Sequence, residues 1–239
     1  MGKTLRPVTL PVLAITVILA ITAIGANASL TTYSTSASFD SATFGLTTQN
    51  FSFLSTTVGP GGSATVDNSL NSSTNNGFVL PGNIAAGLDI AALTNVGGDL
   101  ALAGPNVFGI GNANYMVVGN YTNSGLQFTF APGVTAFSLG VLSEFSSVDA
   151  LLSVYSPSSA LLGSIVLSSL PTSGSGAFIG VTSGGPIGSV VLAAPADGAS
   201  FVAVDQVQFG SAVPEPGSLL LLGSGLLGAA GMLRKRLGW

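Results

Sequence analysis

The side chains that most often carry out chemistry in proteins are scarce in this sequence. It contains no His and no Cys. The basic residues all lie near the two ends of the chain: Lys3, Arg6, Arg234, Lys235 and Arg236. A nucleophile with a neighbouring base, a lysine nucleophile and a histidine or thiolate metal site therefore cannot form between residues 7 and 233. The sequence predicts no catalytic residue and no enzymatic activity.

Carboxylates are the remaining candidates for acid–base chemistry. Glu144 and Asp149 form the densest acidic pair, and paired carboxylates are the groups that hydrolyse glycosides. Glu144 is the only Glu in the body of the chain, and hence the one good candidate for a general acid. The spacing of five residues and the loop context instead predict two solvated turn residues. We therefore expect no glycosidase site at this pair.

Asp205 is the candidate ligand for a metal ion. It lies within the alternating stretch from Phe201 to Phe209, and strict alternation places its side chain on the same strand face as those two rings. A carboxylate that points inward needs a partner, and no basic residue is at hand to provide one. Backbone and side-chain donors, water and calcium remain as alternatives, because calcium accepts carboxylate and carbonyl oxygens. No other cofactor is predicted.

The charge distribution limits the partners of the chain. Between Pro7 and Leu233 all ionised side chains are acidic. Binding to nucleic acid or to an anionic lipid surface depends on Lys and Arg, so both partners are excluded for this body. A hydrophobic content of 47% is too high for a disordered chain, and we expect the body to fold around an apolar core without disulfides.

The N-terminal residues predict a signal peptide over residues 1–28. Lys3 and Arg6 provide a positive start, an apolar run follows, and Ala26-Asn27-Ala28 has the A-x-A pattern of a signal peptidase site. Cleavage after Ala28 makes Ser29 the first residue of the mature chain. An uncleaved N-terminal anchor is the alternative, and both predict export across the inner membrane.

The C-terminal residues predict a membrane-spanning helix over residues 217–233. This uncharged run is about 25 Å long as a helix, which matches a bilayer core. Arg234, Lys235 and Arg236 follow it directly, and positive residues remain on the cytoplasmic side. We therefore expect the C-terminus inside and the body outside, anchored by this helix before any processing.

Pro214-Glu215-Pro216 precedes this helix. Two prolines cannot continue a helix, so they predict an extended, accessible segment next to the membrane. The motif, the Leu/Gly-rich helix and the basic end together resemble the PEP-CTERM sorting signal, here at residues 213–239. The resemblance implies recognition by an exosortase, a membrane-embedded transpeptidase-like enzyme of Gram-negative bacteria that removes the helix. The alternative is a permanent anchor with an ordinary proline linker.

Residues 29–212 predict an all-β domain, an antiparallel β-sandwich or jelly roll between the signal peptide and the C-terminal helix. Short alternating runs recur between Pro, Gly and Ser turns. The expected strands are 126–130, 135–141, 151–155, 161–167, 177–181, 187–192 and 201–209. The first half is less regular, with strands within 31–54 and 77–118, a polar loop over 59–76 and a short helix near 36–43.

The body also resembles the jelly-roll exported domains that commonly precede a PEP-CTERM signal. The resemblance rests on four segments: Tyr33–Phe39, Thr135–Gly140, Phe178–Val181 and Val204–Val207. It implies a non-enzymatic protein of the cell surface or extracellular matrix, associated with exopolysaccharide and biofilm. Signal peptidase and the exosortase are the expected partners during export, and contact with the inner membrane is expected to be transient.

Two alternative functions remain open from the sequence. The first is a carbohydrate-binding module, in which Tyr115, Tyr121 and Tyr155 are the candidate stacking residues. The second is a surface protein that keeps its C-terminal anchor. The only Trp, Trp239, lies behind the expected cleavage point, so the mature body has no tryptophan for glycan stacking.

Overall fold

The structure is a computed structural model. It describes residues 29–66, 68–93, 100–107, 115–118, 125–144, 146–174, 176–193, 201–214 and 216–237. The predicted signal peptide, with the cleavage residues Ala26 and Ala28, lies outside the described residues. Glu215 of the sorting motif and the C-terminal Trp239 also lie outside them.

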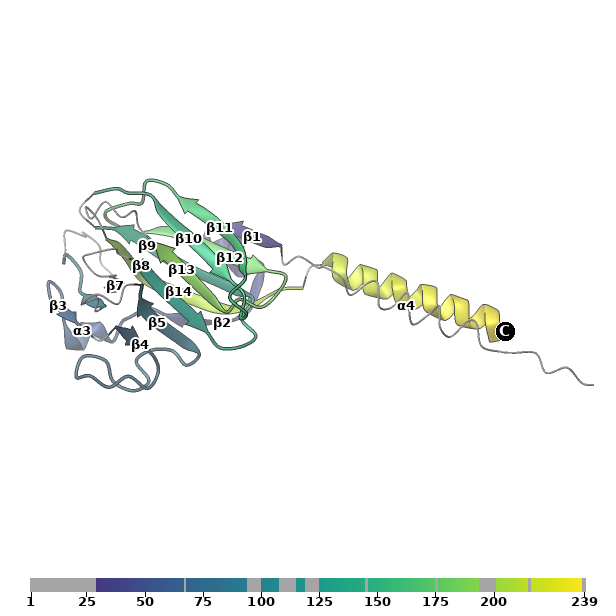
Figure 1. Ribbon diagram of the computed structural model, residues 1–239, viewed down its shortest axis with the longest axis horizontal. Helices are drawn as coiled ribbons and strands as arrows, with labels where there is room; N and C mark the ends of the chain where they lie inside the picture. Colours follow the sequence, from purple (N-terminus) through teal and green to yellow (C-terminus); the bar gives the residue numbers. More distant parts are fainter. Residues whose placement is uncertain are drawn as a thin grey trace, which may run out of the picture.

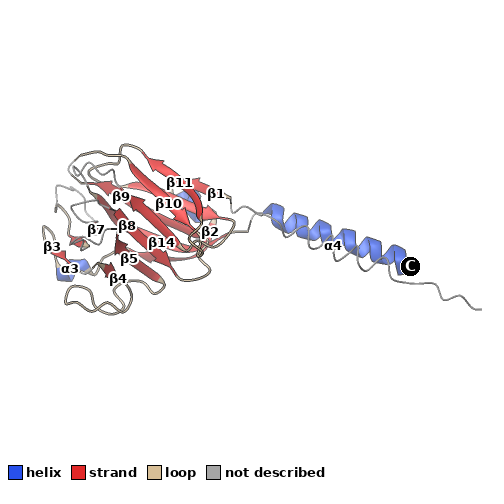
Figure 2. Cartoon of the chain, viewed as in Figure 1, coloured by secondary structure: helices blue, strands red, loops and turns tan. Residues whose placement is uncertain are grey.

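The described chain forms two antiparallel sheets that pack face to face (Figures 1 and 2). Within the described residues, the first sheet has eight strands in the spatial order β1 (Leu30–Tyr33), β12 (Ala177–Ser183), β9 (Ala136–Ser143), β14 (Val202–Ala212), β7 (Met116–Val118), β6 (Ala101–Ala103) and β3 (Ser63–Thr65), with β2 (Thr43–Gln49) also paired to β14. The second has six, in the order β11 (Leu161–Leu167), β10 (Ala150–Tyr155), β13 (Ser189–Ala193), β8 (Gly125–Phe130), β5 (Leu88–Ala92) and β4 (Ser69–Leu70). Helices α2 (Ser36–Ser41), α3 (Leu54–Thr57) and α4 (Pro216–Leu237) complete the fold.

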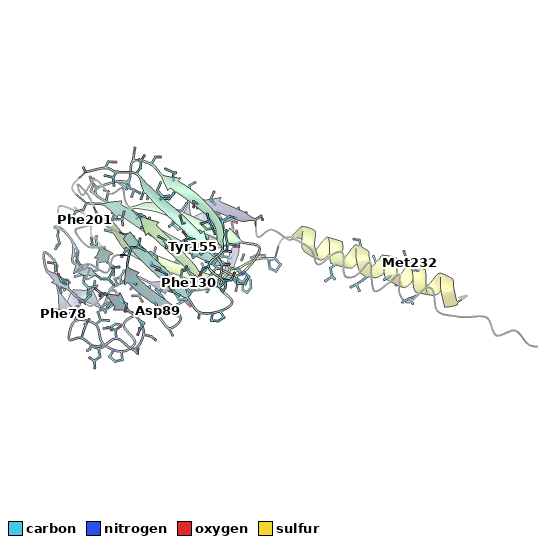
Figure 3. All side chains as sticks on the ribbon, in the orientation of Figure 1. Phe78, Asp89, Phe130, Tyr155, Phe201 and Met232 are labelled. Carbon is cyan, nitrogen blue, oxygen red and sulfur yellow. The ribbon has the colours of Figure 1, made fainter. Side chains whose placement is uncertain are left out.

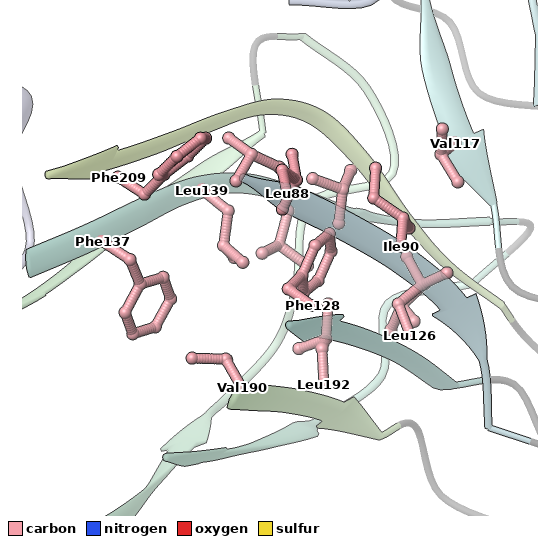
Figure 4. Packing of buried hydrophobic residues seen from close by; sticks show 14 of the residues in the cluster. Leu88, Ile90, Val117, Leu126, Phe128, Phe137, Leu139, Val190, Leu192 and Phe209 are labelled. Atoms are coloured by element: carbon pink, nitrogen blue, oxygen red, sulfur yellow. The ribbon is translucent and has the colours of Figure 1, made fainter. Parts of the chain in front are cut away.

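The core lies between the two sheets (Figure 4). Alternate residues of facing strands point into it, as Val190 and Leu192 of β13 do opposite Leu139 of β9. Phe130 and Phe209 bring two rings from opposite sheets to a centroid distance of 5.6 Å. A buried Phe side chain contributes about 1.5–3 kcal/mol, so this apolar layer stabilises the packing of the two sheets.

The second half of the chain confirms the prediction from alternation. Strands β8 to β14 occur at the expected segments, with turns at Pro132-Gly133 and Ser156-Pro157-Ser158 between them. The short helix near residues 36–43 is also confirmed as α2. The prediction of a purely polar loop over 59–76 was wrong, because β3 and β4 lie within it. Both are very short strands, and their pairing with β6 and β5 is set by tertiary contacts that local alternation does not show.

The expectation that Phe201, Asp205 and Phe209 share one strand face was wrong. A β-bulge interrupts the pairing of β14 with β9 between Val204 and Gln206, with Asp205 as the extra residue. An extra residue reverses the alternation of all later side chains. Phe201 therefore packs in a second cluster, with Met116, Val118 and Leu142 among others, whereas Phe209 lies in the main core.

Helix α4 follows the sandwich and projects away from it (Figure 1). It covers the segment 217–233 that the sequence predicts as a helix. Among the described residues, no helix is both long and apolar enough to span a bilayer. The predicted membrane crossing is therefore not confirmed by the structure.

Candidate sorting site at the end of the sandwich

The sorting segment begins where the sandwich ends. Strand β14 ends at Ala212, and α4 begins at Pro216, so only three residues lie between them. Of these, Val213 is 46% exposed and Pro214 is also exposed. Neither proline can donate a backbone hydrogen bond, so the segment cannot join the sheet beyond Val213 through its prolines. The structure thus places an accessible Pro214 directly outside the folded body.

Strand β2 holds the last residues before the motif on one side. The backbone N–H of Val213 donates to the carbonyl oxygen of Ala42 at 2.9 Å, and Ala212 pairs with Thr43. The hydroxyl of Thr43 in turn donates to the carbonyl oxygen of Phe39 in α2, also at 2.9 Å. The end of β14 is therefore tied through β2 to a helix whose Phe39 is fully buried.

Thr135 holds the same strand end on the other side. Strand β9 begins at Ala136, which pairs with Gly210, so no β9 residue lies opposite Ala212. Instead the side-chain oxygen of Thr135 accepts the hydrogen bond from the N–H of Ala212 at 2.9 Å. The N–H of Thr135 also donates to the carbonyl of Gly210 at 2.9 Å. The Thr135 side chain thus adds one hydrogen bond beyond the last backbone pair between β9 and β14.

Thr135 also connects this site with the N-terminal strand. Its carbonyl oxygen accepts from the N–H of Ser183 at 2.8 Å, and Ser183 pairs with Leu30 of β1. The N–H of Gly184 donates to the carbonyl of Ser29 at 3.2 Å. Strands β1, β12, β9 and β14 are successive neighbours, so Ser29 and the end of β14 are about 14 Å apart. The expected mature ends therefore leave the sandwich on the same side, where α4 begins (Figure 1).

Helix α4 carries exposed apolar side chains. Leu226, Leu227 and Met232 are among those more than half exposed, and Met232 projects into solvent in Figure 3. Such a surface is unfavourable in water, since about 25 cal/mol per Å² is lost for apolar area left exposed. The basic residues Arg234, Lys235 and Arg236 lie in the last turns of the same helix. The apolar and basic segments thus follow Pro214 in the order that the sequence predicts.

The two members of the predicted acidic pair, Glu144 and Asp149, lie in different environments. The expectation that Glu144 is solvated was wrong, because its side chain is fully buried and burial raises the pKa of its carboxyl group to about 8. Asp149 is exposed, and its Oδ1 accepts from the N–H of Ser169 at 2.8 Å. Glu144 follows β9 directly, and its N–H donates to the carbonyl of Phe201, which draws the residue into the fold. Its burial depends on this long-range contact and has no local sequence signal.

Asp205 is buried, as the sequence predicts, although on a bulge rather than in a regular strand. Within the described ranges, no group of three or more His, Cys, Asp or Glu side chains gathers to hold a metal ion. Calcium binding at Asp205 therefore stays a prediction of the sequence alone.

The three predicted stacking tyrosines do not form one platform in the described structure. Tyr115 packs against the main core, and Tyr121 lies outside the described residues. Tyr155 lies at the end of β10, on the outer face of the second sheet. It begins a cross-strand row, in which Tyr155 pairs with Ser189, Ser189 with Thr129 and Thr129 with Asp89. Figure 3 labels the two end members, Tyr155 and Asp89.

This row combines an aromatic ring, two hydroxyl groups and a carboxylate on one face. The neighbouring core-facing residues Val190, Phe128 and Ile90 point to the opposite side, which confirms that the row faces outward. Thr129 and Asp89 are exposed, and Tyr155 and Ser189 are half-buried. Four strands spaced by about 4.8 Å make the row about 14 Å long. The sequence alone suggested Tyr155 but not its three companions, since they come from three other strands.

Comparison with known proteins identifies the C-terminal segment. Residues 212–236 match the family model described as the PEP-CTERM protein-sorting motif. No curated protein matches the chain. One similar solved structure comes from a study of binding sub-sites in a family 6 carbohydrate-binding module, with a TM-score of 0.30, 16% identity, and coverage of 62% of this chain and 95% of that chain. A TM-score of this size supports no inference about ligand. The chain carries a PEP-CTERM sorting motif at residues 212–236, which marks it as an exported protein that an exosortase sorts.

Proposed function

We propose that this chain is a non-enzymatic protein of the cell surface or extracellular matrix. In this proposal, signal peptidase removes residues 1–28, and an exosortase-like enzyme removes the tail at the Pro214-Glu215-Pro216 segment. The sandwich of residues 29–212 is the exported product, and it acts in association with exopolysaccharide in a biofilm. Before processing, the helix over 217–233 anchors the chain in the inner membrane, with the basic end at 234–236 as the stop-transfer signal.

The observation that carries this proposal is the position of the motif relative to the fold. The last strand ends at Ala212, Val213 still donates a hydrogen bond to Ala42, and Pro214 is exposed just beyond. Removal of the tail therefore deletes no strand and no core residue of the described sandwich. The motif thus lies outside the folded body, and the product keeps its folded structure.

The composition supports a non-catalytic role. The exported body has no His, Cys, Lys or Arg. The two carboxylates that are closest in sequence, Glu144 and Asp149, differ in environment, because Glu144 is buried and Asp149 is exposed. Glycoside hydrolysis by paired carboxyl groups needs both groups to flank the same bond of the substrate. A structural or binding role fits this set of side chains better.

Mass analysis of the chain recovered from its own host tests the proposal. We expect a product that starts at Ser29 and ends between Val213 and Pro216, and Glu215→Ala should block removal of the tail. The matched control is Glu144→Gln, which changes a carboxylate inside the body and leaves the motif intact. Recovery of wild-type chain that still ends at Trp239 would show a permanently anchored surface protein instead.

Glycan binding is the second candidate function, and the row from Tyr155 to Asp89 favours it. A ring face stacks on the apolar side of a sugar, side-chain hydroxyl groups donate hydrogen bonds to sugar hydroxyls and accept them, and a carboxylate accepts them. The length of about 14 Å spans several sugar units, and the acidic body disfavours polyanionic glycans.

Affinity electrophoresis of the mature body, residues 29–213, in gels that contain a neutral polysaccharide tests this candidate. The expected result is retardation that Tyr155→Ala abolishes and that Phe44→Ala does not change. Phe44 is a matched control because its ring is 55% exposed on β2, in the other sheet. If the body migrates equally in gels with and without each polysaccharide of a panel, including that of the host, glycan binding is excluded.

A further inference from the structure

The folded sandwich leaves little free chain for a processing enzyme. Proteases bind substrates as extended strands several residues long, because the backbone of the substrate pairs with an edge of the enzyme. Here β14 ends at Ala212 and α4 begins at Pro216. A cleft that takes three residues before the motif must therefore take Ser211, Ala212 and Val213. These residues are still bonded to the sandwich.

We propose that Thr135 is a positioning residue for removal of the tail: its side chain clasps the end of β14, and this strand end must detach before the Pro-Glu-Pro segment enters the processing enzyme. The proposal rests on the proposed exosortase step. That step breaks one backbone amide bond next to the motif. The acyl group passes to water or to an amine of an acceptor, and the tail leaves with a new amino terminus.

The hydrogen bonds of the strand end show why Thr135 controls detachment. Ala212 bonds to the Thr135 hydroxyl on one side, and Val213 bonds to the Ala42 carbonyl on the other, each at 2.9 Å. The Ala42 contact is made by a backbone group that every residue has. The Thr135 contact is made by a side chain, so the sequence at position 135 decides whether it exists.

The end of β14 has two features that favour local opening. A second bulge shifts the pairing of β14 with β2 between Phe209 and Ser211, which interrupts the ladder just before the clasp. Ser211 and Ala212 are only half-buried, whereas Val207 and Phe209 lie in the core. Few buried contacts and an interrupted ladder are the features of a segment that opens at low free energy. The hydrogen bond between Thr135 and Ala212 therefore lies between the core-packed part of β14 and the exposed Pro214.

The experiment follows loss of the tail from the full-length chain in its host by pulse-chase, and compares Thr135→Val with wild type. Valine keeps the β-branched shape but has no oxygen to accept from Ala212. We expect tail removal to be about twofold to tenfold faster, the factor that corresponds to one hydrogen bond. Thr135→Ser, which keeps the hydroxyl, should restore the wild-type rate. Thr65→Val in β3, exposed on an edge strand of the first sheet, is the matched control and should have no effect.

A linker insertion distinguishes a positioning role from a general loss of stability. Six Gly/Ser residues inserted between Val213 and Pro214 provide extended chain without any detachment of β14. Tail removal should become faster, and adding Thr135→Val should then have no further effect, which is the non-additivity expected for one shared step. An equal acceleration by Thr135→Val in both backgrounds would overturn the clasp, because global destabilisation does not depend on the linker.

Amide exchange at Ala212 separates this inference from the proposed function. In purified full-length chain, Thr135→Val should raise exchange at Ala212 by about twofold to tenfold and leave the core amide of Val190 unchanged. If the wild type retains its tail in cells while this exchange rises, the sorting proposal fails and the clasp of β14 stands. If the tail is removed at the same rate in wild type and Thr135→Val, the positioning role is wrong and the sorting proposal stands.

Discussion

The ring of Phe39 lies against the backbone of Gly180. A Cβ atom added at Gly180 would lie 2.6 Å from Cδ2 of Phe39, closer than side chains pack. Phe39 comes from α2 and Gly180 from β12, which pairs with β1 on one side and β9 on the other. Tyr33 and Phe178 complete the packing, with ring centroids 5.8 and 6.0 Å from that of Phe39. This contact fixes α2, and through it β2, beside the strand that precedes the sorting motif.

Replacing Gly180 by Ala should destabilise the body by about 1–3 kcal/mol, because the added methyl group overlaps a rigid ring. Chemical denaturation of the body measures the free energy of unfolding. Gly163→Ala is the matched control, since its nearest neighbour is the flexible Cδ2 of Leu30 at 3.2 Å. Equal effects of the two substitutions would contradict the contact between Phe39 and Gly180.

Phe39→Ala should cost about 3–5 kcal/mol in unfolding free energy, because a fully buried ring is lost. Phe44→Ala removes a ring of the same size that is 55% exposed, five residues along the chain, and should cost about 1 kcal/mol or less. Thermal unfolding of both variants makes the comparison. Similar losses would show that α2 is not held by Phe39.

The buried carboxyl group of Glu144 predicts a pH dependence of stability. Burial raises its pKa from 4.5 to about 8, so between these values the folded chain holds a proton that the unfolded chain releases. The free energy of unfolding therefore falls as the pH rises from about 4.5 to 8, by at most about 1.4 kcal/mol per pH unit. Below this range the neutral form is present in both states, and the contribution is constant.

Glu144→Gln tests this dependence, because an amide cannot ionise. The variant should lose much of the fall in stability between pH 5 and 8 and should be more stable than wild type at pH 8. Asp149→Asn is the control, because it removes one negative charge at the surface and leaves the buried carboxyl group of Glu144 in place. An unchanged slope in Glu144→Gln would show that another group titrates in this range.

Ser159 has a positive φ of 62° in the turn between β10 and β11. Its N–H donates to the carbonyl of Ser156 at 2.9 Å, so the turn requires this conformation. A β-branched side chain is strained there, and Ser159→Val should destabilise by about 1–2 kcal/mol, whereas Ser159→Gly should be neutral or stabilising by up to about 1 kcal/mol. Ser158→Val is the control, since Ser158 has no positive φ. Denaturant midpoints of the three variants test the order.

The second half of the fold was predictable because each strand carries its own signal. In β8 and β13 one face is buried and the other is not, so alternation predicts both the strand and its core side chains. The first half was less predictable, since β3 and β4 have two or three residues each. Such short strands contain too few residues for an alternating pattern to recur, and only their partners β6 and β5 define them.

The candidate sites divide in the same way. The sorting motif is contiguous, so Pro214, Glu215, Pro216 and the basic end are recognised from residue order alone. The clasp between Thr135 and Ala212 joins residues 77 apart, and the row from Tyr155 to Asp89 takes one residue from each of four strands. No local pattern signals such contacts, because they depend on which strands become neighbours.

The sequence by itself determined the C-terminal sorting motif, the absence of common catalytic side chains from the body and the all-β class, since each depends on residue order, composition or periodicity along the chain. Only the tertiary structure decided that Glu144 is buried, that a bulge at Asp205 places Phe201 and Phe209 on opposite faces, and that Thr135 holds the chain before the motif. The physical reason is that burial, register and hydrogen-bond partners are set by the free energy of packing whole sheets together, to which each residue contributes only a part.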